Sequence, residues 1–161
     1  MDALKLRQLI QEVLNSIGMY SPDAEELLIA TCANESNLGR YRTQAKGGPG
    51  RGIYQIEVGT FGDIWANYLK YHSDLAQRVM ALNDNQIGSA NDLVNNDRYA
   101  TALCRVFYMR CPGVLPAAGD IDGIWKYYKQ FYNTPEGAAV ESIFKYKYNS
   151  YVLGETDGDH K

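Results

Sequence analysis

The sequence predicts a mainly α-helical (α+β) protein with one small β-hairpin. Apolar residues recur at helical spacing over most of the chain, whereas segment 37–52 is rich in glycine and breaks that pattern. With 161 residues and 45% hydrophobic content, the chain is long enough to bury one core. It shows no internal repeat and no low-complexity tract. We therefore expect a single domain over residues 1–153 and a flexible polar tail over 154–161.

The N-terminal segment predicts an amphipathic helix. Its apolar residues share one face and are Leu6, Ile10, Val13, Leu14 and Ile17. The segment lacks a basic region followed by an apolar run, which a signal peptide or a membrane anchor would need. We therefore expect neither export by a signal peptide nor membrane insertion.

The next helix is predicted from Ser21 to Glu35. Ser21 can cap it, Pro22 would be its first residue, and acidic residues follow near the positive end of the helix dipole. One face is mostly apolar or small and consists of Ala24, Leu28, Thr31, Cys32 and Glu35. Glu35 should therefore point toward the core.

Glu35 is the first candidate for chemistry. A carboxyl held against apolar side chains has its charged form disfavoured, so we expect its pKa to rise to about 6 and its proton to persist near neutral pH. Such a group suits proton donation to a bound ligand. The alternative on helical geometry alone is that Glu35 ends the helix and faces water.

The segment that follows Glu35 predicts a loop with tight turns or a small hairpin. It contains Pro49 and five glycines, at positions 39, 47, 48, 50 and 52. It is also basic within a chain of net charge −3, through Arg40, Arg42, Lys46 and Arg51. These cations would attract an anionic ligand, although solvated surface charge is the alternative interpretation.

Helical patterns continue after this loop. The expected helices run from Thr60 to Leu69, from Ser73 to Leu82, from about Arg98 to Arg110, from Asp120 to Tyr132 and from Thr134 to Tyr151. Asp63 stands at the reciprocal capping position of the first of them, which predicts a structural role for its carboxylate. The helix from Arg98 to Arg110 is the best candidate for a central, buried helix.

Cysteine and histidine usage does not favour thiol or zinc chemistry. Cys32, Cys104 and Cys111 form an odd set without metal-ligand spacing, which predicts reduced thiols. A catalytic thiol would want a histidine partner, and the two histidines are His72 and His160 of the tail. We expect no metal and no cofactor. No phosphate-cradling motif follows a strand, and we expect no nucleic-acid partner.

Tyrosine is in excess, with thirteen in the chain. Several are expected beside Glu35, namely Tyr41, Tyr54, Tyr127, Tyr128 and Tyr132. Aromatic rings combine flat apolar faces with polar edges, which suits the alternating faces of a sugar. Core packing is the alternative role for each ring taken alone.

Three motifs occur in an order that resembles a known superfamily. They are Glu35-Ser36, Gly52-Ile53-Tyr54-Gln55-Ile56 and Phe131-Tyr132-Asn133-Thr134-Pro135-Glu136-Gly137. This trio resembles the motifs of soluble lytic transglycosylases and goose-type lysozymes, and it covers roughly residues 21–152. The whole chain is most similar to small cell-wall-degrading proteins of bacteriophages. It departs from the family at Tyr54, where methionine is frequent, and at Thr134 and Glu136, where small residues are usual.

The resemblance implies a lysozyme-like helical domain with its hairpin beside an active-site cleft. Glu35 would be the acid/base, and Gln55 would hold the sugar or the backbone near it. The implied substrate-binding set is Ser36, Tyr54, Gln55, Tyr132 and Asn133. Taken alone, Gln55 would be an ordinary hairpin residue and Tyr132 a core or surface aromatic.

The implied reaction is cleavage of the MurNAc–GlcNAc β-1,4 linkage of peptidoglycan, with Glu35 protonating the leaving oxygen. A hydrolase needs a second carboxylate, for which Glu57 is the first choice and Asp63 the second. Without one, the sugar's 6-hydroxyl would close an anhydro ring, as in lytic transglycosylases. No metal is needed on either route.

The expected partners are glycan strands and, for a virion component, other virion proteins. Synthesis would take place in the host cytoplasm and action at the bacterial cell wall. A second hypothesis, from a different class, is a non-catalytic virion structural or peptidoglycan-binding protein that retains the fold. A chitin-active enzyme is the third.

Overall fold

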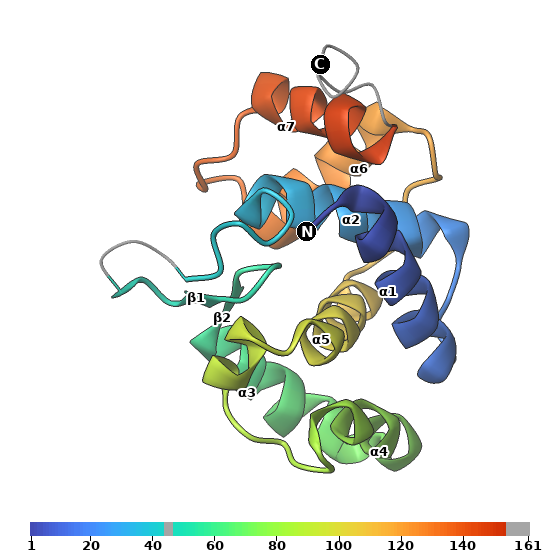
Figure 1. Cartoon of the computed structure of the whole chain (residues 1–161), viewed down its shortest axis with the longest axis vertical. Coiled ribbons are helices and arrows are strands. Elements are labelled where there is room, and N and C mark those ends of the chain that lie inside the picture. Colours follow the sequence, from blue (N-terminus) through green and yellow to red (C-terminus); the bar gives the residue numbers. More distant parts are fainter. Residues whose placement is uncertain (44–46, 154–161) are drawn as a thin grey trace.

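A computed structural model describes residues 1–43 and 47–153 of the chain (Figure 1). These residues form seven α-helices and one two-stranded antiparallel sheet, which confirms the predicted mainly α class. None of the helices in these ranges is both long enough and apolar enough to cross a bilayer. The predicted tail 154–161 and Lys46 of the basic loop lie outside the described residues.

The helices and strands follow one another in a simple order. The α-helices are α1 (Ala3–Ser16), α2 (Pro22–Ser36), α3 (Val58–Asn67), α4 (Ser73–Met80), α5 (Asp97–Arg110), α6 (Ile121–Tyr127) and α7 (Glu141–Lys147). The strands are β1 (Gly50–Arg51) and β2 (Ile56–Glu57). Short 3-10 turns are η2 (Leu69–Tyr71), η3 (Ala81–Asn83) and η4 (Ala90–Val94). Two π-helical turns, η5 (Tyr128–Asn133) and η6 (Tyr148–Val152), extend α6 and α7.

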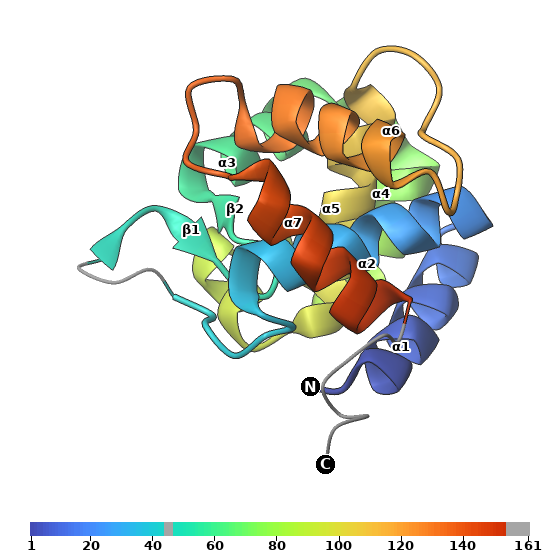
Figure 2. The ribbon, with the colours of Figure 1, turned by 90° about the horizontal axis from the view of Figure 1, so that it is seen from above.

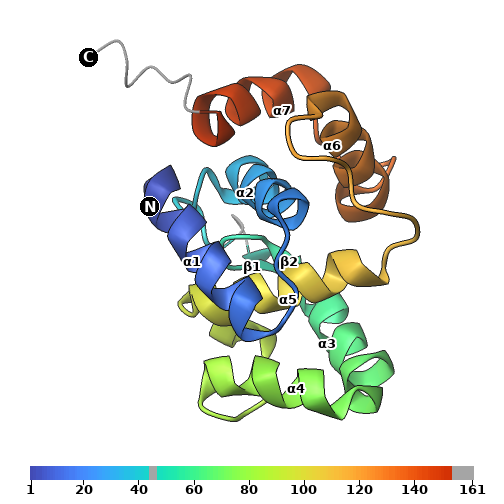
Figure 3. The ribbon, with the colours of Figure 1, turned by 90° about the vertical axis from the view of Figure 1, so that its right-hand side faces the viewer.

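Two buried helices, α2 and α5, pack against most of the other helices. Helix α2 contacts α1, α5 and α7, and Figure 2 shows α7 crossing over it. Helix α5 contacts α1, α3 and α4, so α6 and α7 lie at one end of the molecule and α3 and α4 at the other (Figure 3). The prediction that α5 is central is confirmed. Helix α2 is central too. The face of α2 that contains Leu28 is buried, and the opposite face is also buried because α7 packs against it.

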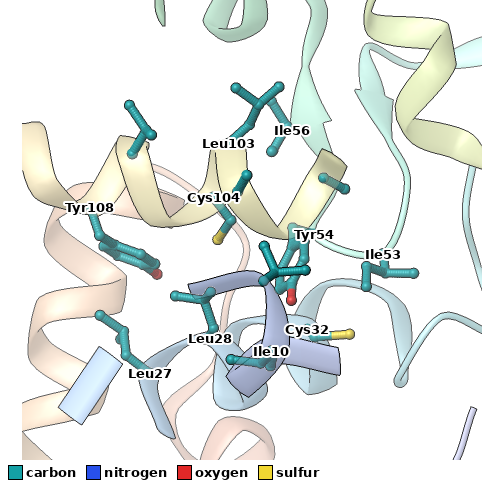
Figure 4. Close-up of a cluster of buried hydrophobic side chains, with 14 of the residues drawn as sticks. Ile10, Leu27, Leu28, Cys32, Ile53, Tyr54, Ile56, Leu103, Cys104 and Tyr108 are labelled. Atoms are coloured by element: carbon teal, nitrogen blue, oxygen red, sulfur yellow. The ribbon is translucent and has the colours of Figure 1, made fainter. Parts of the chain in front are cut away.

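The main core lies between α1, α2, α5 and the hairpin. Figure 4 shows Ile10, Leu27, Leu28 and Leu103 packed around the rings of buried tyrosines. The hydroxyls of these tyrosines have partners, as a buried hydroxyl requires. The Tyr54 hydroxyl lies 2.8 Å from Thr101 Oγ1, and the Tyr108 hydroxyl lies 2.8 Å from Thr31 Oγ1.

The start of α2 follows the sequence signals closely. Ser21 Oγ accepts a hydrogen bond from the Ala24 backbone N–H at 3.0 Å, and Pro22 occupies the first helical position. The helix ends at Ser36, because Asn37 adopts a left-handed conformation with φ 52°. Glu35 therefore stands in the last turn, next to the point where the chain turns into the loop.

The predicted hairpin is present, and it is fastened to the body of the protein. Strands β1 and β2 pair antiparallel, with Arg51 opposite Ile56. The Gly52 N–H donates to the Arg42 carbonyl at 2.7 Å, and the Arg42 guanidinium is paired with Asp97 of α5 at 2.5 and 3.1 Å. The hairpin is thus held against the N-terminal end of α5.

Two residues predicted to cap helices, Thr60 and Ser73, do not do so. Helix α3 begins at Val58 rather than after Thr60, because strand β2 runs directly into it. Asp63 then caps nothing, and it accepts hydrogen bonds from Asn67 at 2.6 Å and from Arg110 at 3.0 Å. Helix α4 begins at Ser73 itself instead of being capped by it.

The last helix also begins later than predicted. Thr134 and Pro135 do not open it, because residues 134–140 form a loop and α7 starts at Glu141. The preceding helix is confirmed in its start, where Asp120 accepts from the Gly123 N–H at 3.0 Å. Its second half widens into the π-helical turn η5, which periodicity at 3.6 residues per turn does not predict.

We expect Gly52→Ala to destabilise the protein by more than about 2 kcal/mol. Gly52 has φ +78°, and an added Cβ would lie 2.3 Å from the Leu93 carbonyl oxygen. Gly47 is the matched control, since its φ is +71° but nothing lies within 4 Å of its Cβ position. Gly47→Ala should cost only the conformational strain, about 1 kcal/mol. Urea unfolding measures both, and equal losses would contradict the tight hairpin contact.

Candidate active site

A cleft of about 420 Å³ opens between the end of α2, the hairpin, α5 and the π-helical turn η5. Its lining residues are Glu35, Gln55, Ile56, Glu57, Thr60, Phe107, Phe131, Tyr132, Asn133 and Thr134. Residues of all three sequence motifs therefore meet in one cavity. Of the seven predicted site residues, the cleft brings together Glu35, Gln55, Glu57, Tyr132 and Asn133.

The Glu35 carboxyl is half-buried at the wall of this cleft. Burial raises its pKa from the ordinary value of 4.5 to about 7. A hydrogen bond from Tyr128 opposes this rise, the negative charge of Glu57 adds to it, and the Lys147 cation lowers the pKa again. The predicted upward shift is confirmed, so a large fraction of Glu35 carries a proton at neutral pH.

Tyr128 fixes the Glu35 carboxyl in place. Its hydroxyl donates to Glu35 Oε2, and it accepts in turn from the Asn34 side-chain amide at 2.7 Å. Within the described residues, the other carboxyl oxygen, Oε1, has no hydrogen-bond partner. One oxygen is therefore held and the other is free to exchange a proton with a ligand.

A stack of aromatic rings packs against Tyr128. The Tyr128 ring is stacked with Phe144 at 5.0 Å and with Tyr132 at 5.8 Å, and Tyr132 is stacked on Tyr108 at 5.3 Å. Phe107 meets the edge of Tyr132 at 5.0 Å. Because Tyr128 and Tyr132 both belong to η5, the π-helical turn carries the ring that bonds Glu35 and a ring that lines the cleft.

Tyr132 joins the C-terminal part of the site to the hairpin. Its hydroxyl donates to the Tyr54 backbone carbonyl at 2.5 Å, and its ring lines the cleft. The prediction that Tyr132 lines the cleft is confirmed. The same contact gives Tyr132 a structural task that the sequence did not indicate.

Asn133 lines the cleft but uses its side-chain oxygen internally. Asn133 Oδ1 accepts from Lys129 Nζ at 2.8 Å and from the Ala139 N–H at 3.3 Å. These contacts hold the ends of loop 134–140 together. Thr134, at the start of this loop, has φ 72° and ψ 153°, a combination that is almost restricted to glycine. The cleft wall therefore contains a strained residue that its neighbours hold in place.

Ser36 and Tyr54, both predicted to bind substrate, are not among the cleft-lining residues, and their side chains are buried. Ser36 is 1% exposed, and its hydroxyl donates to the Ile53 carbonyl at 2.6 Å while accepting from the Gly39 N–H at 2.8 Å. Tyr54 is fully buried and points into the core (Figure 4). Both residues attach the hairpin to the body of the protein because this part of the hairpin faces inward.

Gln55 lies at the hairpin turn and lines the cleft. Its Nε2 donates to the Gly52 carbonyl at 3.0 Å and to the Tyr41 carbonyl at 3.4 Å. The resemblance implies that Gln55 holds either the sugar or the backbone near Glu35. In the structure, its side chain binds two backbone carbonyls. Tyr41 itself is exposed and is not among the cleft-lining residues.

The two candidates for a second carboxylate differ in position. Glu57 is exposed and lines the same cleft as Glu35. Asp63 is not among the lining residues and is paired with Arg110 at 3.0 Å. Of the two candidates, Glu57 is therefore the carboxylate that shares the cleft with Glu35.

Several site residues were not predicted. The sequence placed Tyr128 near the site but did not indicate that it bonds Glu35, and it did not single out Thr60 or Phe107 for the cleft. The spacing of Tyr128 and Tyr132, four residues apart near a conspicuous run of aromatics, is the signal that could have found this wall.

None of the three cysteines is among the cleft-lining residues. Cys32 and Cys104 are free and buried, and burial raises the pKa of the Cys32 thiol to about 12. Over residues 1–43 and 47–153, no group of three or more His, Cys, Asp or Glu side chains is placed to hold a metal ion.

Comparisons of the chain with protein families, with curated proteins and with solved structures gave no match.

We expect the stability gap between Glu35→Gln and the wild type to depend on pH. The folded protein binds the Glu35 proton with a pKa of about 7 and the unfolded chain with about 4.5, so the wild type loses stability as the pH rises through this interval. Glutamine is neutral throughout. The variant should gain up to about 3 kcal/mol relative to the wild type between pH 4.5 and pH 8.

Urea unfolding at several pH values measures this gap. Glu12→Gln is the control, because Glu12 is an exposed partner of Arg98 and is not among the cleft-lining residues. Its stability difference from the wild type should change little over the same interval. A gap for Glu35→Gln that stays constant with pH would show that the Glu35 pKa is not raised.

Removal of the Tyr128 hydroxyl should raise the Glu35 pKa further. The hydroxyl stabilises the charged carboxylate by donating to it, and Tyr128→Phe loses that donor. Titration of glutamate side-chain carbons by NMR reports the pKa directly. Tyr127→Phe is the matched control, since the Tyr127 hydroxyl faces the Pro112 carbonyl at 3.4 Å. An unchanged Glu35 titration in Tyr128→Phe would remove Tyr128 from this role.

Proposed function

We propose that the protein is a peptidoglycan-cleaving glycosidase of the lysozyme-like superfamily. Its substrate is the MurNAc–GlcNAc β-1,4 linkage, and Glu35 is the general acid/base. The observation that carries this proposal is a half-buried carboxyl with a pKa of about 7 at the wall of an open cleft. The ordered motif trio, with residues from each motif meeting at that cleft, supports the same assignment.

Glu35 has the properties that glycosidic cleavage requires of an acid. Its raised pKa keeps a proton available at neutral pH, and Tyr128 holds one oxygen while the other has no partner within the described residues. Transfer of this proton to the glycosidic oxygen releases the leaving sugar. General acid catalysis of this kind is worth about 10²–10⁴ in rate.

The walls of the cleft suit a carbohydrate. Phe107, Phe131 and Tyr132 offer aromatic surface, and Gln55 and Thr60 add polar groups. The volume of about 420 Å³ falls within the range of small-ligand pockets, about 300–1,000 Å³. A glycan would pass beside Glu35 in such a cleft and leave its chain ends in solvent.

Two second steps fit this site. If Glu57 activates a water molecule, the water adds to the anomeric carbon and the product has a reducing end. If Glu35 acts next as base, it takes the proton of the sugar's 6-hydroxyl, that oxygen bonds to the anomeric carbon, and a 1,6-anhydro end forms. We favour the second route because the motif trio is more similar to lytic transglycosylases.

The proposed setting follows from the same resemblance. A phage-type enzyme would be made in the host cytoplasm and would act on glycan strands of the cell wall. It would do so either as an endolysin or as a virion-associated hydrolase in contact with other virion proteins.

We expect dye release from stained peptidoglycan by the wild type and a loss of about 100-fold or more in Glu35→Gln. Glu12→Gln should match the wild type. No release by a wild type that still binds peptidoglycan would favour the non-catalytic alternative. Undiminished release by Glu35→Gln would contradict the role of Glu35, and cleavage of chitin oligomers alone would contradict the substrate.

Mass spectrometry of the released fragments distinguishes the two second steps. Anhydro ends and reducing ends differ by one water molecule. The transglycosylase route predicts anhydro ends that persist in Glu57→Gln. Reducing ends that disappear in that variant would identify Glu57 as the base of a hydrolase.

A further inference from the structure

A second cavity, which we call the α3–α4 groove, lies at the far end of the molecule from α6 and α7. It has a volume of about 560 Å³, and none of its lining residues belongs to the Glu35 cleft. Its apolar lining comes from Phe61, Trp65, Leu69, Ala76, Met80 and Ile87. The proposed glycosidase reaction makes no use of it.

The polar groups at the bottom of this groove already have partners. Trp65 Nε1 donates to the Tyr99 hydroxyl at 3.0 Å, and that hydroxyl donates to the Ile87 carbonyl at 2.6 Å. The floor therefore offers a ligand apolar surface without a free hydrogen-bonding group. A sugar or a nucleotide would lose its hydration there without compensation, whereas a hydrocarbon chain would gain.

The aromatic part of the groove lining is little exposed to solvent. Phe61 and Trp65 are each 7% exposed, Ala76 is 8% exposed and Leu69 is fully buried. A stable protein partner buries about 800 Å² on each side, more than the lining of this groove offers by itself. The volume instead matches a small-molecule pocket, for which about 300–1,000 Å³ is typical.

The rim of the groove carries one charged residue, and its charge is positive. Lys70 is the one charged residue of the lining, and its ammonium lies 5.7 Å from the centre of the Tyr71 ring. Within the described residues, Lys70 has no carboxylate partner. Ser73 and Gln77, also on the rim, have exposed side chains that make no hydrogen bond within the described residues. This rim complements an anionic head group.

We propose that the α3–α4 groove binds a free long-chain carboxylate, that is, a fatty acid. The aliphatic chain lies along Trp65, Met80 and Ile87, and the carboxylate meets Lys70, with Ser73 and Gln77 as hydrogen-bond donors. The proposal does not depend on the glycosidase function. It rests on the apolar floor of the groove, on the hydrogen bonds that already satisfy the polar groups there, and on the positive charge at the rim.

Calorimetric titration with octanoate, decanoate and dodecanoate, each below its micelle-forming concentration, tests the apolar floor. Burial of one methylene group changes affinity by about fourfold, so each step of two carbons should strengthen binding by about 15-fold until the groove is filled. Saturable binding with this chain-length dependence supports the proposal. Equal affinities, or no saturable binding of any member, would overturn it.

Two glycines of α3 provide a matched pair of variants. Gly62 lines the groove and Gly59 does not, and an added Cβ at either position meets nothing within 4 Å. Leucine favours a helix more than glycine does, so both substitutions should leave the fold intact. Gly62→Leu should weaken dodecanoate binding at least tenfold and Gly59→Leu should not. Equal effects would place the ligand elsewhere.

Lys70→Gln tests the head group. The wild type should prefer dodecanoate to dodecylamine, and the variant should lose most of this preference while it still binds the chain. An unchanged preference would contradict the role of Lys70. Binding to phosphatidylglycerol vesicles without binding of monomeric dodecanoate would show that a membrane surface, not a free fatty acid, is the ligand.

Discussion

The hydrogen bond between Tyr128 and the half-buried Glu35 carboxyl is the interaction on which the site depends. Its two partners are 93 residues apart in the chain, one in the last turn of α2 and the other in the π-helical turn η5. Burial keeps a proton on the carboxyl near pH 7, and the tyrosine limits the rise in pKa while it orients the group. A more exposed glutamate would lose its proton, and an unanchored one would lose its direction.

The rest of the fold can be understood as support for this pair. Ser36 and Tyr54 attach the hairpin to α2 and α5, and Gln55 holds the hairpin turn. Tyr132 bonds the hairpin from the opposite side, so the two walls of the cleft are joined directly. Burial of Ser36 and Tyr54 is therefore consistent with their place in the motifs, since they build the cleft rather than touch its contents.

Local signals in the sequence were sufficient for some features and insufficient for others. The Ser21 cap, the upward pKa shift of Glu35 and the hairpin were predictable because each depends on near neighbours or on one apolar face. The inward orientation of Tyr54 was not, because a short hairpin can present either side to the core. The bond from Tyr128 was missed because it joins distant segments, and the loop after Asn133 was missed because Pro135 also fits a helix start.

The pH dependence of kcat/KM for peptidoglycan cleavage tests the central claim most directly. If Glu35 must donate its proton to the glycosidic oxygen, kcat/KM will fall about tenfold per pH unit above pH 7, where the free protein loses that proton. A decline that begins near pH 4.5, or a rate that stays constant up to pH 9, would contradict the assignment of Glu35 as the acid.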